Sequence, residues 1–117
     1  MKRLVDYARV INNTNDYGKV PESKNTPLLI VNDEGNSSST RDAMGSRIDT
    51  ITIVYKFDDG VQVKYIREND DGTPYPGSRE VMFIYEILNA QEFEFTGEIR
   101  EAFHSSSALQ KWLKQDL

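Results

Sequence analysis

The stretch that decides the fold of this chain is TITIVYKFDDGVQVKYI, residues 50–66. Apolar and polar side chains alternate on both sides of the central Asp58-Asp59-Gly60, and this alternation predicts two strands that each bury one face. A connection this short predicts that the two strands pair as an antiparallel hairpin.

The register of the hairpin follows from the length of its loop. A two-residue loop would place Phe57 opposite Gln62 and so set the apolar face of one strand against the polar face of the other. A three-residue loop keeps one apolar face, and it requires Gly60 as a bulge residue in the left-handed backbone region. The cross-strand pairs that this loop predicts are Phe57–Val61, Tyr55–Val63 and Ile53–Tyr65.

Weaker patterns surround the hairpin. We predict strands over residues 28–31, 48–57, 61–68, 80–87 and 92–96. After Gly97 the apolar spacing fits helices, with a serine among 105–107 as the N-cap of the last one. The helical stripes consist of Ile99, Ala102 and Phe103, and then of Leu109, Trp112 and Leu113. Residues 1–12 fit a helix better than a strand, because Arg9 interrupts the alternation.

These elements predict one α+β domain over residues 1–117. Its antiparallel sheet of about four or five strands is expected to carry the C-terminal helix on one face. The helix predicted over residues 1–12 is expected to pack on the same face.

Two segments lack periodicity and are predicted as loops. Residues 33–46 hold four serines and two glycines. A loop of about fourteen residues is long enough to be functional or disordered. Residues 69–78 hold Tyr75 between two prolines. That tyrosine is either a rigid aromatic anchor for a partner or a side chain folded back onto the sheet.

Composition and spacing exclude several kinds of site. The chain has no cysteine and one histidine, so disulfides, thiolate metal sites and multi-histidine metal sites within one chain are ruled out. No glycine-rich phosphate loop occurs, and neither Asp33-Glu34-Gly35 nor Asp70-Asp71-Gly72 has the ligand spacing of a calcium loop. His104 lies beside Ser105, but a helix cap accounts for that serine better than a catalytic pair does. We therefore predict no catalytic, cofactor or metal residues.

Charge is unevenly distributed along the chain. The net charge is −5, which argues against direct nucleic-acid binding. Residues 1–57 hold seven acids and eight bases, whereas residues 58–117 hold twelve acids and six bases. The acidic second half is either a contact surface for a basic partner or a means of solubility.

No apolar run is long enough for a secretory signal or a membrane span. We therefore expect a cytoplasmic protein that does not enter a membrane. Small acidic chains of this motif-free kind are frequent among accessory proteins of phages and mobile elements, which is the origin that the composition suggests.

Three functions remain open after these exclusions. The preferred one is a non-enzymatic protein-binding module, such as an inhibitor, an immunity protein or a regulatory accessory protein. The alternatives are an assembly subunit that oligomerises through a sheet edge and a small metal-dependent enzyme that uses Asp and Glu. The predicted partner is a protein with a basic surface, and the predicted contact residues are Asp58, Asp59, Glu68, Asp70, Asp71 and Tyr75.

Overall fold

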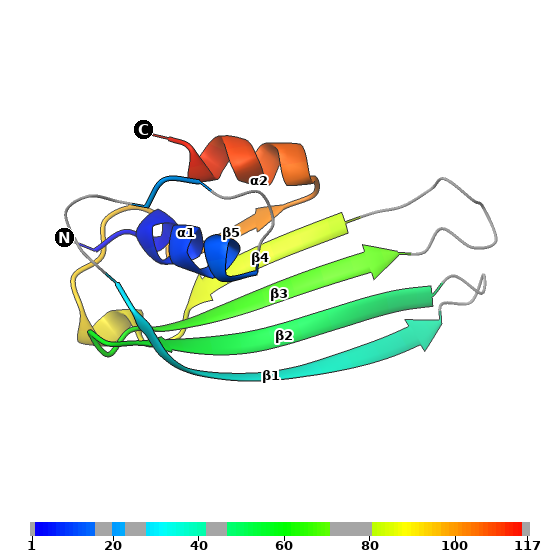
Figure 1. Ribbon diagram of the computed structural model, residues 1–117, viewed down its shortest axis with the longest axis horizontal. Helices are drawn as coiled ribbons and strands as arrows, with labels where there is room; N and C mark the ends of the chain where they lie inside the picture. Colours follow the sequence, from blue (N-terminus) through cyan, green and yellow to red (C-terminus); the bar gives the residue numbers. More distant parts are fainter. Residues whose placement is uncertain (1, 16–19, 23–27, 42–46, 71–80, 116–117) are drawn as a thin grey trace.

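The structure is a computed structural model that describes residues 2–15, 20–22, 28–41, 47–70 and 81–115 (Figure 1). It is elongated, with principal extents of 47 × 27 × 23 Å. The elements in chain order are α1 (Leu4–Thr14), β1 (Ile30–Arg41), β2 (Arg47–Phe57), β3 (Gln62–Asp70), β4 (Val81–Ile87), the 3₁₀ turn η1 (Ala90–Glu92), β5 (Arg100–Phe103) and α2 (Ser106–Leu113).

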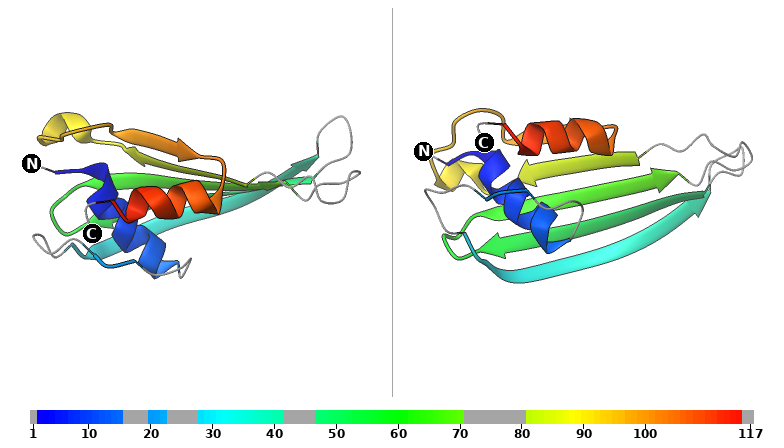
Figure 2. Two further views of the ribbon diagram at one scale, coloured as in Figure 1. Left: turned by 90° about the horizontal axis from the view of Figure 1, so that it is seen from above. Right: turned by 45° about the horizontal axis from the view of Figure 1, so that its top comes forward.

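The five strands form one antiparallel sheet in the order β1-β2-β3-β4-β5. Both helices lie on the same face of this twisted sheet, as Figure 2 shows, and α2 lies beside β4 and β5. The predicted α+β class and the packing of two helices on one face are therefore confirmed. None of the helices in the described part of the chain is long and apolar enough to cross a membrane.

The hairpin has the predicted register. Tyr55 pairs with Val63 and Ile53 pairs with Tyr65, while the Phe57 N–H donates to the Val61 carbonyl at 3.0 Å. Gly60 has a φ of +93°, which is the left-handed conformation that the three-residue loop requires. The apolar set of both strands consequently lies on the face that the helices cover.

The core forms between this face of the sheet and α1. The apolar stripe in residues 1–12 predicted this helix. Tyr7, Ala8 and Ile11 of α1 are fully buried in one cluster with the apolar side chains of the hairpin. Arg9 is also buried, and its guanidinium donates to the carbonyls of Leu113 at 2.7 Å and of Gln115. Because Leu113 is the last residue of α2 and Gln115 lies just beyond it, Arg9 ties the two helices together.

The C-terminal helix begins where the serine run predicted. Ser105 is the N-cap of α2, and its Oγ accepts a hydrogen bond from the Ala108 N–H at 3.1 Å. Trp112 is half-buried and packs with Phe103 and Tyr85 at ring-centroid distances of 4.9 and 5.9 Å. It therefore contributes to the core, as its position on the helical stripe suggested.

The prediction of a loop over residues 33–46 is wrong for residues 33–41, which belong to β1. Every residue from Asn32 to Arg41 pairs with β2. A segment of Ser, Asn and Gly has a low strand propensity. The backbone of β2 nevertheless offers it hydrogen-bond partners, and backbone hydrogen bonds do not depend on the side chains. Gly35 also fits this pairing, because a Cβ there would lie 2.9 Å from Cγ1 of Ile53. Residues 42–46 lie outside the described residues.

The elements between β4 and α2 also differ from the prediction. Residues 92–96 form no ladder strand; Glu92 ends η1, and Phe95 makes an isolated parallel bridge with Lys2. The alternation in this segment arises because Phe93 and Phe95 pack against the core while the glutamates face solvent. The fifth strand is instead Arg100–Phe103, part of the stretch predicted as helix. Four residues are too few to distinguish the apolar period of a helix, 3.6 residues, from that of a strand, 2 residues. Pairing with the open edge of β4 makes this segment a strand.

The positive φ of Gly60 predicts how substitutions in the turn affect stability. Gly60→Val is expected to lower the free energy of unfolding by about 1–3 kcal/mol, because a β-branched residue is strained at positive φ. Gly60→Asn is the matched control, since asparagine tolerates this conformation, and it should cost clearly less. Urea unfolding of both variants measures the difference; equal and negligible losses would contradict the bulged turn.

Candidate functional site

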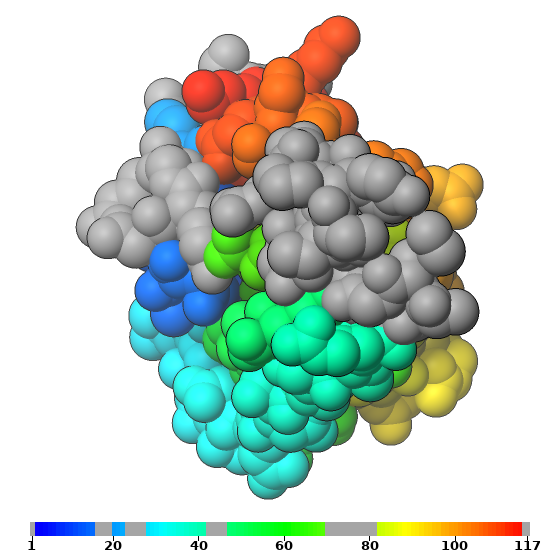
Figure 3. All heavy atoms as spheres, turned by 90° about the vertical axis from the view of Figure 1, so that its right-hand side faces the viewer, coloured from blue at the N-terminus to red at the C-terminus, as the bar shows by residue number. Residues whose placement is uncertain are grey.

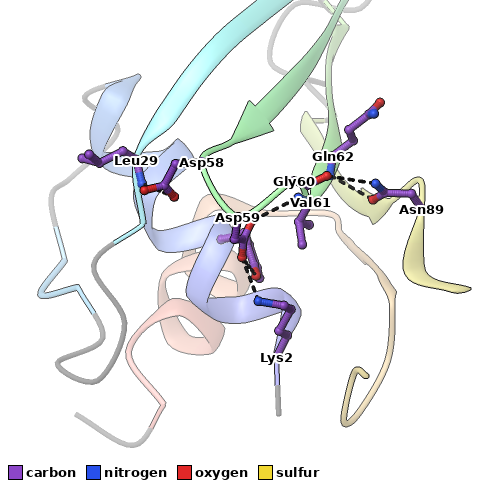
Figure 4. Close-up of polar contacts among 9 residues, drawn as sticks. Lys2, Leu29, Asp58, Asp59, Gly60, Val61, Gln62 and Asn89 are labelled. Carbon is purple, nitrogen blue, oxygen red and sulfur yellow. Dashed lines mark hydrogen bonds and ion pairs between the residues drawn. The ribbon is translucent and has the colours of Figure 1, made fainter. Parts of the chain in front are cut away.

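The hairpin turn holds an ionic network that ties the sheet to the start of the chain (Figure 4). The Asp59 carboxylate accepts hydrogen bonds from Lys2 Nζ at 2.9 Å, from the Tyr7 hydroxyl and from the Val61 N–H at 3.0 Å. Its side chain is 20% exposed. Asp59, predicted as a partner contact, therefore already has three partners inside its own chain.

The electrostatics of this network follow from its geometry. Burial on its own raises the pKa of Asp59, but the hydrogen bonds from Tyr7, Val61 and Lys2 outweigh it and hold the pKa below its usual value. Burial, together with the hydrogen bond to Asp59, raises the pKa of Tyr7 well above its usual range. The carboxylate stays charged and the phenol stays protonated, which suits a structural contact.

The other predicted acids that the structure describes do not converge on one site. Asp58 is exposed in the turn, where its N–H donates to the Leu29 carbonyl at 2.9 Å. Glu68 is half-buried on β3 opposite Thr50, and Asp70 ends that strand, at the far end of the hairpin from the turn. Asp71 and Tyr75 lie outside the described residues, so the structure does not place them.

The surface that stands out in the structure is the edge of the sheet along β1. After a half-buried Ile30, every residue of this twelve-residue strand is exposed. β1 is the terminal strand of the sheet and pairs with β2 on one side. In Figure 3 its atoms form the lower surface of the end of the molecule.

The backbone groups on the outer side of β1 can be assigned from the hairpin register. The Asp58 N–H points toward β1 and the Phe57 N–H toward β3. Because backbone direction alternates along an antiparallel strand, Lys56 also points toward β1, and its partner Asn32 points back. The register shifts between Ile30 and Asn32, so this assignment holds from Asn32 onward. Over that part of β1, the N–H and C=O groups that point away from the sheet belong to Asp33, Gly35, Ser37, Ser39 and Arg41.

Side chains along this edge leave its middle open. Charged residues occur at its ends, as Asp33 and Glu34 and as Arg41, whereas residues 35–40 carry neither charge nor proline. Charges and prolines are the usual means by which edge strands avoid pairing with other chains. Beside the edge, Leu29 and Val31 are 64% and 63% exposed, so apolar surface adjoins the open backbone.

Sequence reasoning missed this edge because the segment resembles a loop in composition. One signal in the sequence was available. The segment between the apolar run Leu28–Val31 and the strand predicted over residues 48–57 is long enough to lengthen both of them into one longer antiparallel pair. Gly35 in this segment suits the close approach of a neighbouring backbone. Composition favoured the loop, and pairing with β2 overrode it.

Other features offer less chemistry. An open pocket of about 320 Å³ lies between the start of α1, residues 96–98 and α2, and its charged lining consists of Arg3, Glu98 and Glu101. Arg3 is engaged by Asp6 at 3.2 Å. His104 is exposed, and the Oγ of the adjacent Ser105 caps α2. Among the described residues no group of three or more His, Cys, Asp or Glu side chains is placed to hold a metal ion.

Comparison with known proteins adds no assignment: no family model, no curated protein and no solved structure matches this chain.

The turn network predicts a pH-dependent contribution to stability. Asp59→Asn is expected to lower the free energy of unfolding at pH 7 by about 1–2 kcal/mol, because hydrogen bonds to a charged group are lost at a partly exposed site. The folded pKa of Asp59 is lowered, so this contribution is complete above about pH 4 and is lost as the pH falls through the folded pKa.

Urea unfolding from pH 7 down to about pH 2 tests this, with the exposed Asp58→Asn as control. The gap between wild type and Asp59→Asn should narrow below about pH 4, and the control should show a smaller effect throughout. A gap that is constant with pH would mean that the charge of Asp59 contributes nothing.

Proposed function

We propose that this protein is a non-enzymatic protein-binding module and that the β1 edge is its binding surface. The observation that carries the proposal is a long terminal strand, exposed from Val31 to Arg41, whose outward backbone groups are covered by no other described element. Such an edge accepts an extended segment of another chain as an added strand. Binding would inhibit or regulate the partner protein if the bound segment is one that the partner requires for its own activity.

The chemistry of the edge defines the segment that fits it. Backbone hydrogen bonds supply affinity without regard to sequence, and small side chains at Gly35, Ser37 and Ser39 leave room for those of the partner. Asp33 and Glu34 favour a basic residue near one end of the added strand, since opposite charges across strands attract. Exposed Leu29 and Val31 offer an apolar contact beyond that end.

The acidic character of the chain fits the same surface. Asp58 lies beside Leu29 at the start of β1 and adds a third carboxylate to Asp33 and Glu34. Charges on the rim of an interface mainly accelerate association with a partner of opposite sign. Among the predicted contact residues, Asp58 is therefore the one that we retain for this edge.

Proline substitution separates binding from folding on this edge. Ser37→Pro removes an N–H that points away from the sheet, so it should block an added strand and leave the melting temperature nearly unchanged. Ser38→Pro is the matched control, because the Ser38 N–H points toward β2. It should lower the free energy of unfolding by about 1 kcal/mol or more.

Binding is measured by placing a photo-cross-linking amino acid at Ser39 and identifying the cross-linked polypeptide by mass spectrometry. The expected cross-link is lost in Ser37→Pro and kept in Lys64→Glu, whose side chain lies on the face of β3 without helices. A cross-link of equal yield in a folded Ser37→Pro protein would show that the partner does not add to β1.

The enzyme alternative makes a separate prediction. A divalent cation bound at its site would stabilise the folded state by mass action and raise the melting temperature. Our proposal of a non-enzymatic module predicts instead that millimolar Mg²⁺, Mn²⁺ or Ca²⁺ leaves the melting temperature unchanged. A rise with one cation and not with the others would instead favour a metal site built from acidic side chains.

A further inference from the structure

We propose that the strand added to β1 is β1 of a second copy of this chain, so that two molecules form a two-fold dimer with one continuous sheet. This inference rests on the proposed function and names its partner. It follows from two properties of β1, which are the direction of its backbone groups and the order of its charges.

Backbone direction restricts the registers in which two β1 strands can pair. Each copy offers the outward N–H and C=O groups of Asp33, Gly35, Ser37, Ser39 and Arg41, so antiparallel pairing must set members of this set opposite one another. With Ser37 opposite Ser37 of the second copy, all five residues face a member of the set. Residue pairs of this kind exchange two hydrogen bonds each, which gives about ten across the interface.

The charges of β1 select this same register. Asp33 then lies opposite Arg41 of the second copy, and the two-fold axis repeats that pair at the other end of the ladder. Paired residues lie on the same face of an antiparallel sheet, where opposite charges attract. A shift of two residues in either direction separates Asp33 from Arg41 and shortens the ladder.

The described elements leave room for a second copy beside β1. Among them, no helix lies beyond β1 on its outer side in Figure 1, and α2 is at the opposite edge of the sheet. Between the two Asp33–Arg41 pairs, the cross-strand pairs would be Glu34–Thr40, Gly35–Ser39, Asn36–Ser38 and Ser37–Ser37, and Glu34 would face an uncharged threonine. An interface that uses the same patch on both molecules closes on itself, so the assembly stops at two copies.

Sedimentation over a range of concentrations from micromolar to millimolar tests the dimer with the full chain. The wild type should pass from monomer to dimer, and Ser37→Pro should remain monomeric at every concentration. Asp33→Arg and Arg41→Asp should each weaken the dimer by about tenfold or more, because each places like charges opposite one another twice.

Mixing the two charge variants provides the decisive test of register. Asp33→Arg carries arginine at both ends of β1 and Arg41→Asp carries aspartate at both ends, so a heterodimer of the two restores both opposite-charge pairs. Native mass spectrometry of the equimolar mixture should show the heterodimer in large excess over either homodimer. The double variant Asp33→Arg/Arg41→Asp should dimerise as the wild type does.

Each outcome has one meaning. A wild type that stays monomeric at millimolar concentration overturns the dimer, and it leaves the proposed function to the photo-cross-link at Ser39, which then reports another protein. A dimer that Ser37→Pro does not weaken overturns the use of the β1 edge for self-association. A dimer that survives both single charge variants, with no excess of heterodimer on mixing, overturns the register.

Discussion

The constraint on which the structure depends is the three-residue turn of the β2–β3 hairpin. Gly60 at a φ of +93° allows the bulge that sets Tyr55 opposite Val63. One residue more or less would carry every apolar side chain of one strand to the other face. Helix α1 could then not pack on a continuous apolar surface, and the turn would not present Asp59 to Lys2 and Tyr7. The polar network at the turn and the core beneath α1 thus have one origin.

The same register determines how the far edge of the sheet meets solvent. The turn sets which residues of β2 direct their N–H and C=O groups toward β1, and together with the β1–β2 register this determines which residues of β1 point outward. A shift of one residue would turn the carbonyls and N–H groups of Asn32, Glu34 and Asn36 outward and those of Asp33 inward. The proposed pairing of Asp33 with Arg41 of a second copy therefore depends on both hairpin registers, of which Gly60 sets one.

Much of the fold was predictable because local patterns carried it. The alternation in residues 50–66 specified two strands and their pairing, the apolar stripe specified α1, and the serine run specified the cap of α2. These features depend on neighbours within a few residues. The candidate edge was not predictable in the same way, since Ser, Asn and Gly in residues 33–41 carry no periodic apolar signal. The acids singled out by charge that the structure describes are divided between the two ends of the hairpin.

The sequence by itself determined the hairpin register, the α+β class and the exclusion of disulfides, thiolate metal sites and multi-histidine metal sites within one chain, because each depends on residue type or local spacing. Only the tertiary structure decided that residues 33–41 form a strand, that Arg100–Phe103 completes the sheet in place of residues 92–96, and that Asp59 is held by Lys2 and Tyr7. The physical reason is the same in all three cases. Backbone pairing and ionic contacts between residues far apart in the chain outweigh weak local preferences, and a single sequence does not show which distant partner is available.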